Sequence, residues 1–239
     1  MGKYKNLAKG IILFFLVVFL YAFSSVRSRN LPIQKTSVEF IGKDHLLISK
    51  DAVNKLLIQN HQAVECIPKD ILDLNELESK VSSHPMIEKA EVYLTINGEV
   101  KLEVEQRTPL ARVISEPSFY IDDQGKMMPL SAEHSARVVL IRGNVDASHL
   151  DALHQLLQHV KTDDFLDLHV TEITVNNDNQ FSLYVRAFDF EVVVGTLENL
   201  NNKMKNFKAF YQKAKKDKLL QTYKTVNLQF NRQVVCTKL

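Results

Sequence analysis

Histidine is the residue type in this chain that most invites a chemical role, and the sequence contains eight of them. His149, His154 and His159 recur every five residues in a segment with helical periodicity. Histidines that share a metal ion on a helix must lie on one face, as residues about four positions apart do. Five steps of about 100° rotate each successive side chain by roughly 140°, so these three histidines point apart. The spacing therefore predicts solvated histidines and no metal site.

Cysteine and glycine patterns point away from metal, redox and nucleotide chemistry. The two cysteines, Cys66 and Cys236, form no C-x-x-C pair and no cluster with histidine. We interpret them as two separate thiols, with a disulfide between them as the alternative. The sequence contains no glycine-rich phosphate loop and no G-x-S-x-G motif, and Gly125-Lys126 lacks the preceding glycine of a P-loop.

Asp122 and Asp123 are adjacent carboxylates of a kind that could take part in general acid–base chemistry. They occupy a predicted turn, where neighbouring side chains are expected to point outwards into water. The spacing of these residues therefore predicts no catalytic centre. We predict a protein that is not an enzyme and that needs no cofactor.

The charge balance gives no indication of nucleic-acid binding, because the formal net charge is only +2. Seven lysines near the C-terminus fall on a predicted helix and could contact an acidic lipid or partner. A solvated helix face is the favoured interpretation. These lysines are Lys203, Lys205, Lys208, Lys213, Lys215, Lys216 and Lys218.

Residues 10–26 have the composition of a transmembrane helix. The core of the segment, residues 11–23, is uncharged and apolar on all sides. A helix of about 20 residues spans roughly 30 Å, the thickness of one hydrocarbon core. Three lysines in residues 1–9 favour a cytoplasmic N-terminal tail and place the rest of the chain outside the cytoplasm. The alternative is a cleaved signal peptide, for which Ala22-Phe-Ser24 is a weak cleavage pattern.

After a linker of residues 27–34, residues 35–107 have the pattern of a small α+β domain. Ser49 and Asp73 are the predicted N-caps of its two helices. A three-strand sheet with two helices on one face would close a core in a segment of this length. The predicted order is strand, helix, helix, strand, strand, at residues 37–41, 50–59, 74–81, 90–95 and 100–105.

The last two of these strands form a predicted hairpin that turns at Asn97-Gly98. A loop of two residues would place Leu94 opposite Lys101, on conflicting faces of the sheet. A loop of three residues, with Gly98 in the left-handed conformation, pairs Leu94 with Val100 instead. We therefore predict the bulged turn.

Residues 108–239 are predicted to form a β-rich domain with flanking helices. Its long helix should bury Leu200, Met204, Phe207, Tyr211 and Ala214. The chain should finish in one strand from Val226 to Cys236, with a bulge at Asn231-Arg232, at an open sheet edge. The other predicted elements are a hairpin at 118–127, a strand at 138–141, a helix at 146–160, strands at 170–175, 181–186 and 188–194, and the long helix at 197–218.

The motifs resemble those of the bacterial cell-division protein family FtsQ/DivIB. His84-Pro-Met-Ile-Glu-Lys-Ala-Glu-Val92 is similar to the family pattern hPxVxxAxV, and Glu105-Gln-Arg-Thr-Pro-Leu-Ala111 to ExRxPxA. Tyr120-Ile-Asp-Asp-Gln-Gly125 resembles the xxDxxG turn, and Val138-Val-Leu-Ile-Arg-Gly143 resembles LPxixG without its proline. Thr225-Val-Asn-Leu-Gln-Phe230 resembles the closing xvDLRY strand, with Asn227, Gln229 and Phe230 replacing aspartate, arginine and tyrosine.

The resemblance implies an α+β protein with an N-terminal transmembrane helix, a POTRA (βααββ) domain and a β domain. It implies a non-enzymatic scaffold of the divisome, in the inner membrane at the division site, with its outer domains in the periplasm. The implied partners are FtsB and FtsL, with FtsB adding a strand beside the closing strand. The positions carried over as partner contacts are Phe230, Asn231, Arg232, Gln233, Val234 and Val235.

Other functions are compatible with parts of the pattern. One is another POTRA-containing assembly or secretion factor, although such proteins usually carry a large barrel for which this chain has no room. Another is a secreted enzyme or ligand-binding protein whose signal peptide has been removed. At Phe230, the alternative to a partner contact is a core position like those of Val226 and Leu228.

Overall fold

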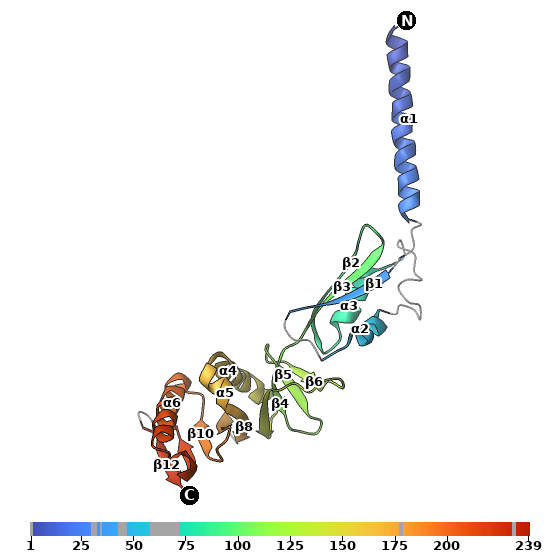
Figure 1. Ribbon diagram of the computed structural model, residues 1–239. Helices are drawn as coiled ribbons and strands as arrows, with labels where there is room; N and C mark the ends of the chain where they lie inside the picture. The colour runs from blue at the N-terminus through green and yellow to red at the C-terminus, as the bar shows by residue number, and fades with distance from the viewer. Residues whose placement is uncertain are drawn as a thin grey trace. The chain divides into compact units, whose positions relative to one another are not determined.

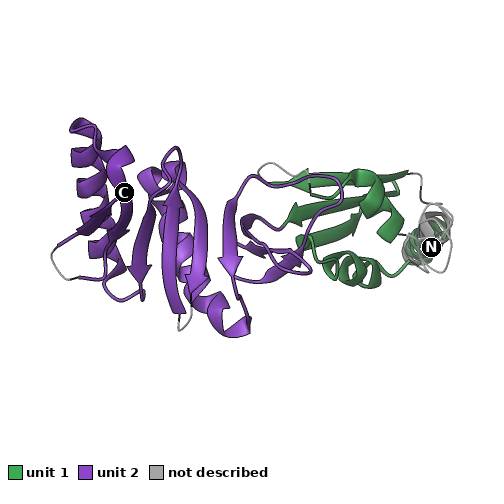
Figure 2. Ribbon diagram, turned by 90° about the horizontal axis from the view of Figure 1, so that it is seen from below, with its two compact units in different colours: residues 1–106 green, residues 107–239 purple. Residues whose placement is uncertain are grey.

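The computed structural model describes residues 2–29, 33, 35–42, 47–57, 72–176, 179–230 and 233–239, with side chains in the first helix described for residues 9–23. The chain divides into two compact units, residues 1–106 and residues 107–239, which Figure 2 distinguishes by colour. Each unit has its own sheet.

The first helix, α1, runs from Gly2 to Arg29 and contains the predicted transmembrane segment. Its large apolar side chains between Ile11 and Phe23 are exposed. Among the residues that the structure describes, no helix combines the length and the hydropathy that crossing a membrane requires.

The rest of the first unit has the predicted order of strand, helix, helix, strand, strand. The side chain of Ser49 accepts a hydrogen bond from the Ala52 N–H, and Asp73 accepts from Asn75 and Glu76, so both predicted N-caps are confirmed. The three strands lie in the order β1-β3-β2, with β1 parallel to β3. The elements are β1 (Lys35–Ile41), α2 (Lys50–Leu56), α3 (Leu74–Ser82), β2 (Ile87–Leu94) and β3 (Glu99–Gln106).

The hairpin of β2 and β3 has the predicted register. Leu94 pairs with Val100 and Val92 pairs with Leu102. Gly98 has φ +85°, the left-handed conformation that the bulged turn requires. This register puts Val100, Leu102 and the other apolar residues of β3 on the buried face of the sheet.

The second unit is built on a nine-stranded sheet in the order β12-β11-β10-β9-β8-β7-β4-β5-β6. Figure 1 labels strands β12, β10, β8, β4, β5 and β6 of this sheet. Three helices pack on it: α4 (Leu150–Thr162), α5 (Asp164–His169) and α6 (Leu200–Lys216). The short 3-10 turns Ala147–His149 and Leu220–Thr222 precede α4 and β11. The strands are β4 (Pro109–Val113), β5 (Phe119–Asp122), β6 (Met127–Pro129), β7 (Val139–Gly143), β8 (Val170–Asn176), β9 (Gln180–Val185), β10 (Glu191–Gly195), β11 (Tyr223–Asn227) and β12 (Val235–Lys238).

A single row of paired apolar residues crosses six central strands of this sheet and forms the floor of the core. The row passes from β11 to β4 through Val226, Val192, Leu183, Ile173, Ile141 and Val113, none of which has any exposed surface. The predicted inner face of α6 packs in the same core, and all five of its residues are buried. Directly opposed apolar side chains of this kind are the units that stabilise a sheet.

Two elements of the second unit were not predicted. Strand β4 lies at the start of the predicted domain of residues 108–239, before its first predicted element, and it pairs with both β5 and β7. Helix α5 follows α4 directly, with the side chain of Asp163 accepting hydrogen bonds from the Phe165 and Leu166 N–H groups. The prediction of a single terminal strand from Val226 to Cys236 was also wrong. The structure has two antiparallel strands there, β11 and β12.

Candidate functional site at the open edge of the sheet

Strand β12 forms one edge of the nine-stranded sheet. Among the described strands its only neighbour is β11, to which it is antiparallel. Strand β11 itself has neighbours on both sides, since it is also parallel to β10. The accessible edge is therefore β12 and not the segment from Val226 to Phe230.

Two hydrogen bonds establish which backbone groups of β12 face outwards. The Leu239 N–H donates to the Thr222 carbonyl at 3.0 Å, so residue 239 faces β11. The Leu228 N–H donates to the Val193 carbonyl at 2.9 Å, so residue 228 faces β10 and residue 227 faces β12. Successive residues of a strand alternate in direction. The backbone groups of Cys236 and Lys238 are therefore directed away from β11.

The predicted contact residues lie on and before this edge. Phe230 follows β11, and 47% of its surface is exposed, so it is not a core residue like Val226 or Leu228. Gln233 is exposed and Val234 is half-buried. Val235 begins β12 and is 41% exposed. Asn231 and Arg232 lie outside the described residues.

An apolar groove lies between α6 and the terminal strands. It has a volume of about 570 Å³, and its lining includes Phe210, Tyr223 and Val234. The rings of Phe210 and Tyr223 meet edge to face, with centroids 5.2 Å apart. The sequence pattern did not predict this groove. The available signal was Phe210, an aromatic residue on α6 that lies outside the predicted inner face.

The two polar positions that depart from the family pattern in the closing strand contact each other. The Gln229 N–H donates to Asn227 Oδ1 at 2.9 Å, and Asn227 Nδ2 donates to Gln229 Oε1 at 3.3 Å. The Gln229 side chain lies against Gly195, where a Cβ atom would come within 2.5 Å of it. Gly195 has φ +69°, so a larger residue there would be both strained and crowded. These two hydrogen bonds thus fix the conformation of the segment that directly follows β11.

The turn at Asp122-Asp123 differs from the prediction of outward-pointing carboxylates. Asp122 is only 1% exposed, and its carboxylate lies 3.0 Å from Arg107 Nη1. It also accepts hydrogen bonds from the Gln124 and Lys126 N–H groups. Burial and the neighbouring Asp122 raise the pKa of Asp123. The prediction of outward-pointing carboxylates was wrong for Asp122, because its buried side chain accepts hydrogen bonds from backbone N–H groups of the turn and pairs with Arg107 instead of water.

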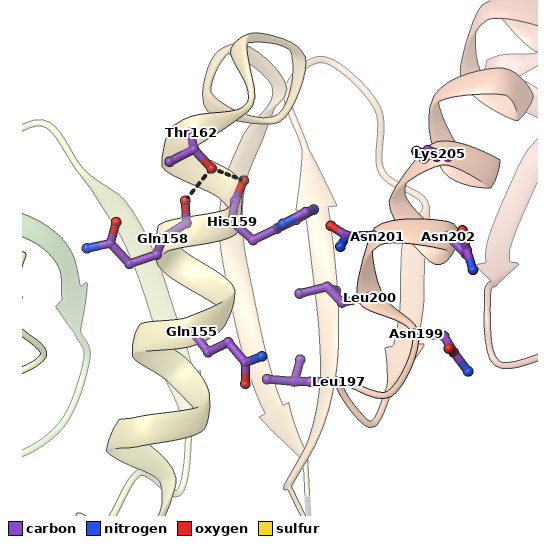
Figure 3. A pocket seen from close by; sticks show the side chains of 10 residues that line it. All are labelled: Gln155, Gln158, His159, Thr162, Leu197, Asn199, Leu200, Asn201, Asn202 and Lys205. Carbon is purple, nitrogen blue, oxygen red and sulfur yellow. Dashed lines mark hydrogen bonds between the residues drawn. The ribbon is translucent and has the colours of Figure 1, made fainter.

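The histidines of the predicted helix have separate roles. His149 takes part in a capping box with Asp146, and His154 Nε2 lies 2.8 Å from the Asp123 carbonyl. His159 lines a groove between α4 and α6, where Figure 3 shows it facing Asn201. Within the part of the chain that the structure describes, no three histidine, cysteine or acidic side chains gather as metal ligands would.

Several of the α6 lysines contact the protein itself. Lys203 Nζ donates to the Val194 and Thr196 carbonyls at 2.9 and 2.7 Å, and burial lowers the pKa of Lys203. Lys208 pairs with Asp163, and Lys213 lies 2.9 Å from Asp217.

The thiol of Cys236 is half-buried on β12, and burial raises its pKa. Cys66 lies outside the described residues, so the predicted choice between thiols and a disulfide stays a prediction.

A βααββ unit followed by a β-rich unit with an open edge strand defines a two-module α+β protein of the POTRA-plus-β type. Residues 108–237 match the family model for FtsQ/DivIB, C-terminal related, and residues 41–105 match the model for a POTRA-like domain. The first match covers more than half of the chain, which therefore belongs to the FtsQ/DivIB family. No curated protein matches the chain. Membership of this family indicates a role related to the divisome.

Proposed function

We propose that the chain is a non-enzymatic divisome scaffold that recognises FtsB- and FtsL-type partners by strand addition at β12. The observation that carries this proposal is the outward direction of the Cys236 and Lys238 backbone groups. Unpaired N–H and C=O groups at a sheet edge accept an extended peptide, and flanking side-chain contacts supply specificity.

The side chains around β12 support an apolar component of this recognition. Phe230, Val235 and Leu239 are large, exposed apolar residues in or next to the terminal strands. The groove lined by Phe210, Tyr223 and Val234 adjoins the same strands and can receive further apolar side chains of the partner. Of the positions carried over from the family, we retain Phe230, Gln233, Val234 and Val235 as contacts on structural grounds, and Asn231 and Arg232 on the resemblance alone.

The proposed location is the inner membrane at the division site, with the POTRA domain of residues 35–107 and the β domain of residues 108–239 in the periplasm. Residues 10–26 are proposed to cross the membrane once, with residues 1–9 in the cytoplasm. The exposed apolar side chains of α1 between Ile11 and Phe23 support this arrangement, because a bilayer would remove their surface from water. Mass spectrometry of the membrane-extracted chain tests it. A mature N-terminus near Ser24 would show a cleaved signal peptide instead.

Lys238→Pro tests strand addition directly. Proline lacks an N–H group, and at an edge strand it is tolerated where that group faces solvent. We expect the fold to remain intact while binding of an FtsB-type partner weakens by about tenfold or more, since an intermolecular hydrogen bond is lost and the ring blocks the edge. Binding is measured by titration calorimetry and the fold by circular dichroism.

Two matched variants separate backbone from side-chain effects. Lys238→Ala keeps the N–H group, so partner binding should change little. Thr237→Pro removes an N–H that faces β11, so it should loosen β12 in the free protein. Unchanged partner binding by Lys238→Pro, or equal loss of binding with Lys238→Ala, would contradict strand addition at β12.

The variant Phe230→Ala should weaken partner binding with little effect on the fold.

A further inference from the structure

A second concave surface of the β-rich unit lies several strands away from β12. It crosses the beginnings of the neighbouring parallel strands β4, β7 and β8 and continues along the C-terminal half of α4. Its volume is about 470 Å³, within the usual range of roughly 300–1,000 Å³ for binding pockets. Its apolar lining includes Leu110, Val138, Leu140, Leu157 and Val160.

The polar lining of this surface is predominantly basic. Arg137, Lys161 and Arg186 line it, together with a single acidic residue, Asp167. Lys161 Nζ lies 3.1 Å from Asp167 Oδ1, so these two charges offset each other. Arg137 and Arg186 are exposed, and neither forms an ion pair with any acid among the described residues. The surface therefore combines an apolar floor with two uncompensated guanidinium groups.

The groove of Figure 3 lacks this combination of apolar residues and arginines. Its walls carry neutral amides such as Gln155 and Asn201, with Leu197 and Leu200 between them. Its one lysine, Lys205, gives it little preference for a charged ligand. The groove across β4, β7 and β8 is different, because guanidinium groups can bind carboxylates through two parallel hydrogen bonds.

We propose that the groove across β4, β7 and β8 binds an acidic–apolar segment of a partner protein. Apolar side chains of the segment occupy the floor between Leu110, Leu140 and Val160, and its carboxylates pair with Arg137 and Arg186. This site is additional to the edge proposed for FtsB- and FtsL-type partners. It would allow a scaffold to hold two partner segments at once.

The chain contains no tryptophan, so the fluorescence of a single introduced tryptophan reports on its own surroundings. Val138→Trp in the full chain places one tryptophan in the lining of the groove, and Gln212→Trp places one on the exposed surface of α6 as a control. The probe is a short peptide of alternating leucine and glutamate, and its counterpart has lysine in place of glutamate. We expect the acidic peptide to change the fluorescence of Val138→Trp and to leave Gln212→Trp unchanged.

Charge reversal then tests the two arginines. In the Val138→Trp chain, Arg137→Glu with Arg186→Glu should weaken binding of the acidic peptide by about tenfold or more, because attraction becomes repulsion. Lys215→Glu with Lys216→Glu changes the net charge equally on exposed α6 positions and should have little effect. Lys238→Pro should also leave this binding unchanged, which separates the site from the β12 edge.

Several results would overturn the proposal. One is an equal response to the lysine peptide, which would show apolar association without charge recognition. Another is equal weakening by the arginine and lysine reversals, which would show a general charge effect. A response to decanoate with none to the acidic peptide would identify the groove as a site for a small amphiphile rather than for a protein segment.

Discussion

The two edges of the nine-stranded sheet differ in the backbone N–H groups that they present outwards. In β6, the Asp122 N–H donates to the Lys126 carbonyl, so residue 126 faces β5 and residues 127 and 129 face outwards. One of these two outward positions is Pro129, which has no N–H group. In β12, the outward positions are Cys236 and Lys238, and both residues have a backbone N–H group.

Short strands and proline are means by which proteins protect sheet edges from other chains. Strand β6 has three residues and ends at proline, so it offers a partner little to pair with. Strand β12 has four residues without proline and is bordered by exposed Val235 and Leu239. The same sheet is thus protected at one edge and open at the other, and the difference locates the candidate site.

The largest expected difference between the edges is in how their strands are anchored. Met128 of β6 is 1% exposed, so Met128→Ala should lower the free energy of unfolding by about 3 kcal/mol. Val235→Ala removes a side chain that is 41% exposed, and should cost less than about 0.5 kcal/mol. Urea denaturation measures both. Similar losses would mean that β12 is as firmly anchored as β6.

The next largest effect is expected at the turn between β5 and β6, the strand at the protected edge. Asp122→Asn keeps an acceptor for the Gln124 and Lys126 N–H groups but removes the charge that pairs with Arg107. We expect a loss of about 2 kcal/mol in unfolding free energy, below that of a fully buried pair because Arg107 is partly exposed. Thermal denaturation tests this. Asp146→Asn, at an exposed helix cap, provides a comparison with a smaller expected loss.

Removing the protection of β6 should make the two edges more alike. Pro129→Val adds an outward N–H group and a β-branched side chain to β6. We expect weak self-association that sedimentation velocity detects at high protein concentration, with partner binding at β12 retained. Pro85→Val, at an exposed proline outside the strands, should leave the protein unassociated. Self-association of both variants would show that edge protection does not reside in Pro129.

The smallest effect should come from Asp123, whose pKa is raised chiefly by burial. A raised carboxyl pKa in the folded state means that ionisation disfavours folding as pH rises. Asp123→Asn should therefore stabilise the protein modestly near neutral pH and give no such gain below the ordinary aspartate pKa of 3.8. Denaturation at both pH values measures the difference. A stability gain confined to acidic pH would contradict the direction of this pKa shift.

Local patterns predicted much of the fold because the relevant interactions are close in sequence. The register of β2 and β3 followed from side-chain parity around Gly98, and the buried face of α6 followed from helical spacing. Strand β4 was missed because its pairing with β5 and β7 is tertiary and because it begins at Pro109, a residue type that is uncommon in strands. The cap at Asp163 was a usable signal for α5, but the helix has only six residues.

The candidate site was predicted in outline but not in its backbone geometry. The sequence predicts an edge strand near the C-terminus, but as one strand from Val226 to Cys236 rather than as two strands. Alternation alone does not distinguish one bulged strand from two antiparallel strands when polar residues separate the apolar runs. For the same reason, the outward direction of Cys236 and Lys238 required the hydrogen bonds of Leu228 and Leu239.

The parallel pairing of β10 and β11 has a consequence for the order of folding. Strand β11 reaches β10 only through the long connection that contains α6, whereas β12 returns to β11 through a short one. Pairings across long connections form more slowly than local ones, because chain entropy must be lost first. We therefore expect the terminal hairpin to dock late, so that only molecules with a completed core would present β12 to another protein.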